Sequence, residues 1–176
     1  MTQTVELPEG FEASFEDGVL TVSDGSNGLE KKMDHALIEV EVDGSKVNFT
    51  PLRTKKDVVS VAGTYKAHTE NMVQGLQNDY VYKMKGVYAH FPMTIKKKGN
   101  EIHIENFMGE AYPRKVDIME GVDVQVDGDD LEVSGPNKEK VSQTAARIEQ
   151  MCHKGNRDPR TFQDGVYITE TNGGKE

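Results

Sequence analysis

Histidine and carboxylate side chains are the residues of this sequence that could support catalysis or metal binding, but their spacing fits neither. The five His residues show no metal-ligand spacing and lie at positions 35, 68, 90, 103 and 153. A lone His on a predicted strand, such as His103 in EIHIEN, is usually a surface or supporting residue. The acidic run VDGDDLE (126–132) fails the EF-hand spacing, so a hairpin turn explains it better than a calcium site.

Sequence signatures of catalysis are also missing. The chain has no GxxxxGK[ST] loop, HExxH motif, GxSxG elbow or dinucleotide fingerprint after a first strand. We therefore expect a protein that is not an enzyme, with no catalytic residue, cofactor, metal or small-molecule substrate. An enzyme that uses His68 or His103 with a nearby Glu is the weakest alternative, because only proximity in the sequence supports it.

Four stretches that mix basic, aromatic, polar and glycine residues point instead to phosphate binding. They read YKAHTENMVQGL (65–76), KKKGNE (96–101), NFMGEAYPRKV (106–116) and CHKGNRDPRTFQDGVYI (152–168). Each alone also fits a solvated loop or an edge strand protected by lysines, and KKKGNE is expected at a hairpin tip. Three of the four lie in the second half of the chain, and their composition suits folded RNA, whose phosphates and backbone shape are recognised.

The charge of the chain is unevenly distributed. The formal net charge of -9 argues at first against a nucleic-acid partner. Residues 1–80 hold 7 Lys/Arg against 14 Asp/Glu, a net of -7, whereas residues 81–176 hold 14 against 16, a net of -2. Because salt screens charges beyond about 8 Å, a local basic field in the second half can bind phosphate although the molecule is acidic.

One hairpin pattern occurs twice, 84 residues apart, as VEVDGSKVNFT (40–50) and VQVDGDDLEVS (124–134). Both copies alternate apolar and other residues around an Asp-Gly turn, which is a strong hairpin signal. Further strands are predicted upstream of each copy, in GVLTVS (18–23) and NEIHIEN (100–106). We interpret the repeat as an internal duplication.

A helix is predicted after each hairpin, because the apolar period changes there from two to about 3.6. In the first half, Thr54 and Asp57 can form a variant of the capping box, and Gly75 with the polar QND behind it (77–79) is expected to close the helix. In the second half, Asn137 is the expected N-cap. The apolar stripe that follows consists of Val141, Ala145, Ile148 and Cys152.

These elements predict an α+β fold with an internal duplication, in which each of two lobes is an antiparallel sheet packed with one main helix. We expect an N-terminal repeat over residues 1–80 and a C-terminal repeat over residues 81–176, with the boundary inside 76–86. Because the C-terminal repeat is the more basic, we expect it to be the main RNA-contacting lobe.

The compartment is expected to be the cytosol. No apolar run approaches the roughly 18–20 residues of a membrane span, and the start MTQTVELPEGFEASFED lacks the regions of a signal peptide. Cys152 is the only cysteine, which excludes an internal disulfide, and we expect it to be a small buried core residue.

Five long blocks of the sequence follow one another along nearly the whole chain. They are SVAGTYKAHTENMVQGL (60–76), VYAHFPM (87–93), IENFMGEAYPRK (104–115), VSGPNKEKVSQTAARIEQ (133–150) and FQDGVYIT (162–169). Together these blocks resemble the L6 family of large-subunit ribosomal proteins, in its archaeal and eukaryotic branch. The resemblance implies a duplicated α+β fold and a structural, non-catalytic constituent of the large ribosomal subunit, located in the cytoplasm within the ribosome.

The resemblance also implies partners and contact residues. The partners are large-subunit rRNA near the sarcin–ricin loop, neighbouring proteins of the stalk base, and translational GTPases docking nearby. The rRNA contacts implied are Arg114 and Lys115, then Lys154, Arg157 and Arg160, then Lys66, His68 and Asn71. Lys96, Lys97 and Lys98 are added from charge alone. The chain departs from the family at Ala111, where a basic residue is usual.

The acidity of the chain leaves two further interpretations open. Excess Asp and Glu is familiar in salt-adapted archaea, so a high internal salt concentration is one hypothesis, tested by stability against added KCl. An acidic two-domain adaptor that presents sheet edges to protein partners is the alternative function. An adaptor would not sediment with large subunits after a high-salt wash.

Overall fold

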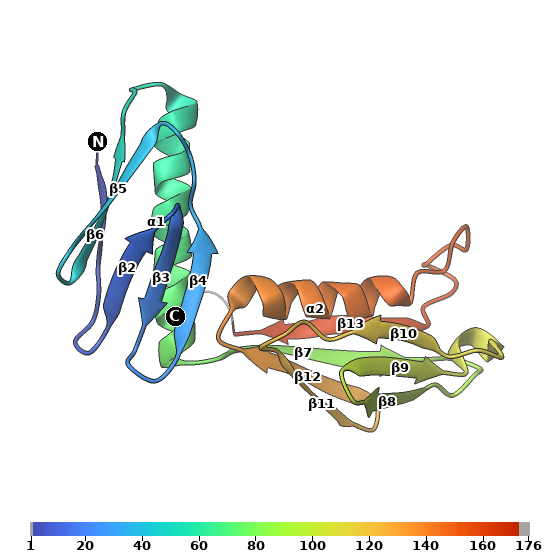
Figure 1. Cartoon of the computed structure of the whole chain (residues 1–176). Helices are drawn as coiled ribbons and strands as arrows, with labels where there is room; N and C mark the ends of the chain where they lie inside the picture. The colour runs from blue at the N-terminus through green and yellow to red at the C-terminus, as the bar shows by residue number, and fades with distance from the viewer. Residues whose placement is uncertain (1, 173–176) are drawn as a thin grey trace. The chain divides into compact units, whose positions relative to one another are not determined.

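The computed structural model describes residues 2–172, and the chain divides into two compact units, Met1–Asn78 and Asp79–Glu176 (Figure 1). The first unit begins with six strands and ends with a long helix. Its elements are β1 (Gln3–Glu6), β2 (Glu12–Glu16), β3 (Val19–Ser23), β4 (Gly28–Lys32), β5 (Ile38–Asp43), β6 (Lys46–Pro51) and α1 (Lys56–Gln77). The strands form two antiparallel sheets in the orders β1-β6-β5 and β2-β3-β4.

The second unit repeats this order and adds a final strand. Its elements are β7 (Tyr80–Val87), β8 (Thr94–Lys98), β9 (Glu101–Glu105), the 3₁₀ turn η1 (Phe107–Gly109), β10 (Arg114–Asp117), β11 (Asp123–Asp127), β12 (Asp130–Gly135), α2 (Lys138–Met151) and β13 (Gly165–Thr171). Its sheets have the orders β11-β12-β7-β13 and β10-β9-β8, with all pairs antiparallel.

The two strand orders show the duplication directly. If β13 is set aside, β7 to β12 pair with one another as β1 to β6 do, and a helix follows the last of them in both units. The register repeats as well, because Val42 faces Val47 across β5 and β6, and Val126 faces Leu131 across β11 and β12. The predicted α+β fold with an internal duplication is confirmed, and each unit carries two sheets beside its one main helix.

Each unit has a core of its own, built from the inward residues of its sheets and one face of its helix. In the first unit Leu20 and Val22 of β3 and Val47 and Phe49 of β6 are fully buried. In the second unit the corresponding positions are filled by the buried residues Ile102, Ile104, Leu131 and Val133. Buried and more open positions alternate along β3, β6 and β12, which is the period-two pattern that the sequence predicted.

Helix α2 follows the prediction closely. The side chain of Asn137 accepts hydrogen bonds from the backbone N–H groups of Glu139 and Lys140, at 3.1 and 3.2 Å, so it is the N-cap. The predicted stripe is buried, including Cys152, which is 4% exposed at the C-terminal end of the helix. Helix α2 packs on β7, β12 and β13, and also contacts β10.

Helix α1 departs from the prediction at its start. Its N-cap is Lys55, which makes no side-chain capping bond, so the capping box expected at Thr54 and Asp57 is wrong. The helix starts one residue too late for Thr54 to cap it, and the Asp57 carboxylate accepts from the backbone N–H of Val58 instead. The predicted end is confirmed, because the helix stops at Gln77 with Asn78 as its C-cap, in the polar residues behind Gly75. No helix among the described residues is long and apolar enough to span a membrane.

Candidate nucleic-acid interface

Three connections gather at one end of the second unit, where β7 and α2 finish and β10 and β13 begin (Figure 1). We call residues 88–93, 106–113 and 152–164 the loop end. The side-chain amide of Asn106 donates to the backbone oxygen of Pro92 at 3.0 Å, which joins the first two segments. The Arg157 guanidinium lies 3.8 Å from the Met108 sulfur, which joins the second to the third. Contacts between residues as much as 49 positions apart in the sequence therefore join the three segments into one surface.

The segment after β9 turns sharply through left-handed backbone conformations. Asn106, Met108 and Gly109 have φ of 58°, 50° and 76°. A Cβ added at Gly109 would lie 3.1 Å from the ring of Phe91, on the neighbouring segment. Two features therefore favour glycine at position 109: the positive φ of its backbone and the close approach of the Phe91 ring.

Large aromatic side chains stay open to solvent on this surface. Tyr112 is 84% exposed, Phe91 is 48% exposed and Phe162 is 41% exposed. Exposed aromatic rings of this kind are suited to stack on unpaired bases. The sequence analysis quoted all three residues without proposing them as contacts, because sequence alone does not separate an exposed aromatic residue from a core one.

Three of the predicted cations are exposed at or beside the loop end. Arg157 and Arg160 belong to the segment after α2, and Lys115 follows the segment after β9 on β10. The Arg157 guanidinium lies 5.3 Å from the centre of the Phe162 ring, an arrangement that pairs a cation with an aromatic face. These side chains can reach phosphate without any rearrangement of the core.

Arg114 is engaged within the protein. Its Nε and Nη2 donate to the two carboxylate oxygens of Glu110 at 2.8 and 2.6 Å, and its Nη1 donates to the backbone oxygens of Met151 and His153 at 2.6 and 2.8 Å. The guanidinium also lies 4.3 Å from the centre of the Phe107 ring. The paired charges lower the pKa of Glu110 and raise the pKa of Arg114.

Lys154 is also turned inward. Its Nζ donates to the backbone oxygen of Phe162 and to the hydroxyl of Tyr167, the latter at 3.0 Å. The Tyr167 hydroxyl in turn donates to the backbone oxygen of Gln163 at 2.9 Å. These bonds close the segment after α2 against β13. They also form one side of a groove of about 590 Å³ that is lined by Lys154, Arg157, Pro159 and Tyr167 among others.

The second unit also resembles a known protein family in sequence. The family model of ribosomal protein L6 matches residues 91–165, which contain nearly all of the loop end. Large ribosomal subunit protein uL6 of Methanococcus vannielii is 40% identical over 171 residues, which cover 97% of this chain and 94% of that protein. The chain belongs to the ribosomal protein L6 family.

Two further archaeal relatives agree with this assignment. Large ribosomal subunit protein uL6 of Methanospirillum hungatei is 41% identical over 166 residues, covering 94% of both chains. The protein of the same name from Haloarcula marismortui is 40% identical over 165 residues, covering 94% of this chain and 93% of its own. The resemblance stated from the sequence blocks is thus confirmed, and the matches extend over almost the whole of both units of this L6 chain.

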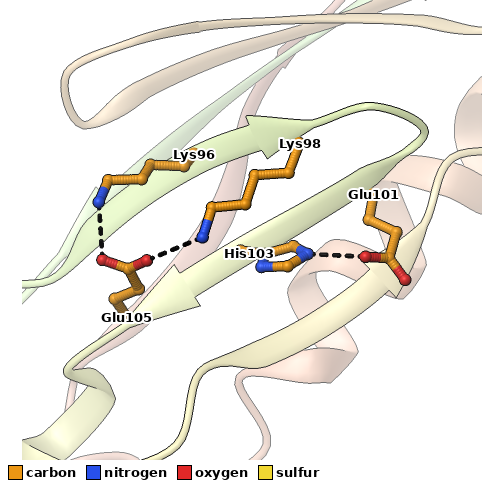
Figure 2. A network of polar contacts seen from close by, with 5 residues as sticks. All are labelled: Lys96, Lys98, Glu101, His103 and Glu105. Carbon is orange, nitrogen blue, oxygen red and sulfur yellow. Dashed lines mark hydrogen bonds and ion pairs between the residues drawn. The ribbon is translucent and has the colours of Figure 1, made fainter.

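The three consecutive lysines of the L6 chain lead into the tip of the β8–β9 hairpin, where Gly99 and Asn100 form the turn. They lie along β8, where their side chains alternate between the two faces of the sheet. Lys96 and Lys98 both contact the Glu105 carboxylate, at 2.8 and 3.3 Å (Figure 2). Lys97 contacts Asp123 at 2.7 Å. Each of the three charges already has an acidic neighbour.

His103 was expected to be a surface or supporting residue, and the structure shows that it is not at the surface. It is 6% exposed, although it belongs to the same face of the sheet as Lys96. Its Nε2 lies 2.7 Å from a carboxylate oxygen of Glu101, while its Nδ1 is buried without a hydrogen-bond partner among the described residues (Figure 2). The long side chains around it exclude water from a position that a strand pattern marks as outward.

The remaining predicted contacts lie in the first unit. Lys66, His68 and Asn71 are half-buried on α1, and Lys66 forms an exposed ion pair with Glu70 at 3.8 Å.

Five of the predicted contact residues come together at or beside the loop end of the second unit. They are Arg114, Lys115, Lys154, Arg157 and Arg160. Glu110 was not predicted to take part. The only sign of it in the sequence was an acidic residue four positions before Arg114, with Pro113 in between.

Proposed function

We propose that this chain is a structural constituent of the large ribosomal subunit and that its second unit binds large-subunit rRNA through the loop end. Membership in the L6 family supports the first part, and it makes a structural role in the cytoplasmic ribosome the function to expect rather than catalysis. The observation that carries the second part is the exposure of Arg157, Arg160 and Lys115 beside open aromatic rings, on segments that are fixed to one another.

The mechanism is electrostatic docking by a preformed surface. Arginine and lysine neutralise phosphates and release counterions, whereas exposed aromatic rings accept unstacked bases without sequence preference. The sheets and α2 hold the cations in place before RNA arrives, so little conformational entropy is lost on binding. The acidic remainder of the chain repels RNA and favours approach through this end.

The location within the subunit is a finer part of the proposal. The sequence blocks resemble a family that sits near the sarcin–ricin loop and the stalk base, beside the surface where translational GTPases dock. We extend this location to the present chain, with stalk-base proteins as its neighbours. Lys66, His68 and Asn71 on α1, and Lys96 to Lys98 on β8, are proposed as secondary contacts. Their existing partners make them weaker candidates than Arg157 and Arg160.

Filter binding to an rRNA fragment that contains the sarcin–ricin loop tests this proposal. Arg157→Ala and Arg160→Ala are each expected to weaken binding by about 1–2 kcal/mol, because each removes a charge-assisted contact. Lys85→Ala is the matched control, since Lys85 is an exposed cation of the same unit that lies on β7 outside the loop end. Equal affinities for the wild type and both arginine variants would contradict the assignment.

The adaptor alternative predicts a different result in a second assay. A protein-interaction adaptor would leave the large subunit in a high-salt wash, whereas a constituent of the subunit is expected to sediment with it. Family membership favours the ribosomal function, and the structure offers no observation that favours the adaptor.

A further inference from the structure

Arg114 connects two parts of the second unit that are 37 to 39 residues apart in the sequence. Glu110 and Phe107 belong to the connection after β9, which leads directly into Arg114 at the start of β10, whereas Met151 and His153 lie at the end of α2. One guanidinium therefore joins the connection after β9 to the start of the segment that carries Arg157 and Arg160. Four of its five N–H groups are used in these contacts.

The contacts of Arg114 with Glu110, Met151 and His153, which we call the Arg114 joint, hold the guanidinium in one position. The two parallel bonds to Glu110 fix the plane of the guanidinium, which only arginine can do. The two carbonyl oxygens come from the last turn of α2 and the residue beyond its C-cap, where unpaired carbonyls and the helix dipole favour a cation. The side chain of Arg114 is only 25% exposed, so its charge is directed inward.

We propose that Arg114, together with Glu110, is a positioning residue that locks the two loops in the arrangement required for RNA binding, and that it is not itself a phosphate contact. This inference rests on the proposed function. Arg157 and Arg160 are the residues it positions. Arg157 extends from the segment that begins just beyond the carbonyl of His153, and its guanidinium reaches back to Met108 beside the Glu110 segment.

Glu110→Gln separates the two roles by the sign of its effect. If Arg114 contacts phosphate, loss of the Glu110 charge frees the arginine and removes a repulsive carboxylate, so RNA binding tightens. If Arg114 positions the loops, the variant weakens the joint, and binding is expected to weaken about threefold to tenfold, within the range of one charge-assisted bond. Glu132→Gln is the control for a lost negative charge, because Glu132 is an exposed residue of β12 outside the loop end.

Arg114→Lys provides a second comparison. A phosphate contact largely survives this exchange, because lysine keeps the charge. The Arg114 joint is lost in this exchange, because lysine cannot bind both Glu110 oxygens and two carbonyls at once. We expect Arg114→Lys to weaken binding nearly as much as Arg114→Ala, and at least about fivefold.

The salt dependence of binding distinguishes positioning from contact. Each lost phosphate contact lowers the slope of log K against log [KCl] by roughly 0.7–0.9. Arg157→Ala is expected to show this change, whereas Arg114→Lys and Glu110→Gln are expected to give lines parallel to that of the wild type at lower affinity. A slope reduced by Arg114→Ala as much as by Arg157→Ala would overturn the inference.

Hydrogen exchange of the free full-length protein completes the test without RNA. The amides of residues 107–112 and 153–163 are expected to exchange faster in Arg114→Lys and Glu110→Gln, while α1 keeps its protection. Unchanged exchange in both segments would overturn the positioning role whatever the binding results. If the wild type itself binds no rRNA fragment, the proposed function fails, and the exchange measurement still decides whether Arg114 orders the loops.

Discussion

Arg157 lies in the loop end and Arg114 directly beside it, but their surroundings differ. Arg157 is exposed and contacts Met108 and the ring of Phe162, so its charge is directed outward. Arg114 is half-buried and bound to Glu110 and the end of α2. The family resemblance implied both as phosphate contacts, because a matching sequence shows charge and loop position but not which donors are already used.

Cys152 illustrates how burial controls chemistry at a single residue. It is 4% exposed, and burial raises the pKa of its thiol to about 11 from the ordinary 9.0. The thiol should therefore be inert in the folded protein at neutral pH, since the thiolate is the reactive form. Lys154 and Arg114 nearby act in the opposite direction but do not outweigh the burial.

The thiol makes a testable contribution to stability at alkaline pH. Because its pKa is raised in the folded state, the contribution is complete below pH 9.0 and is lost as the pH rises toward 11. The free energy of unfolding should fall in this window by at most about 2–3 kcal/mol, because one pKa unit corresponds to about 1.4 kcal/mol. Denaturant titrations of the wild type and Cys152→Ala measure it. A pH dependence identical in the two proteins would show that the thiol is not responsible.

At the scale of elements, the strands and hairpins could be predicted because their signals are local. The Asp-Gly turns at Gly44 and Gly128 have φ of 59° and 62°, which glycine adopts without strain. The start of α1 could not be predicted as well, because Thr54 carries an N-cap signal although the N-cap is Lys55. The burial of His103 could not be predicted either, because the strand pattern places it on the same face of the sheet as Lys96.

The two predicted helix caps offer a matched pair of substitutions. Asn137→Ala should destabilise the protein by about 0.5–2 kcal/mol, because the backbone N–H groups of Glu139 and Lys140 lose their acceptor. Thr54→Ala should change stability by less than about 0.5 kcal/mol, because Thr54 precedes the N-cap of α1. Urea denaturation compares them directly. A larger effect at Thr54 than at Asn137 would contradict the positions of both helix starts.

Over the whole chain, the two copies of the duplicated fold differ in net charge and in their connections. Both units share strand order and register, but the first has a net charge far more negative than the second. The second unit alone adds β13, and the connection from α2 to β13 carries Arg157 and Arg160. The repeat and the charge asymmetry were visible in the sequence. The gathering of three loops at one end was not, because it depends on contacts between segments far apart in the chain.

We expect the loop end of the second unit to lie on ribosomal phosphates. A density map of the large ribosomal subunit with this chain in place tests this placement. The guanidinium groups of Arg157 and Arg160 should lie about 3 Å from phosphate oxygens, while Arg114 keeps its bonds to Glu110 and the end of α2. A map in which the loop end faces open solvent, with rRNA contacting other surfaces of the chain, would contradict the account.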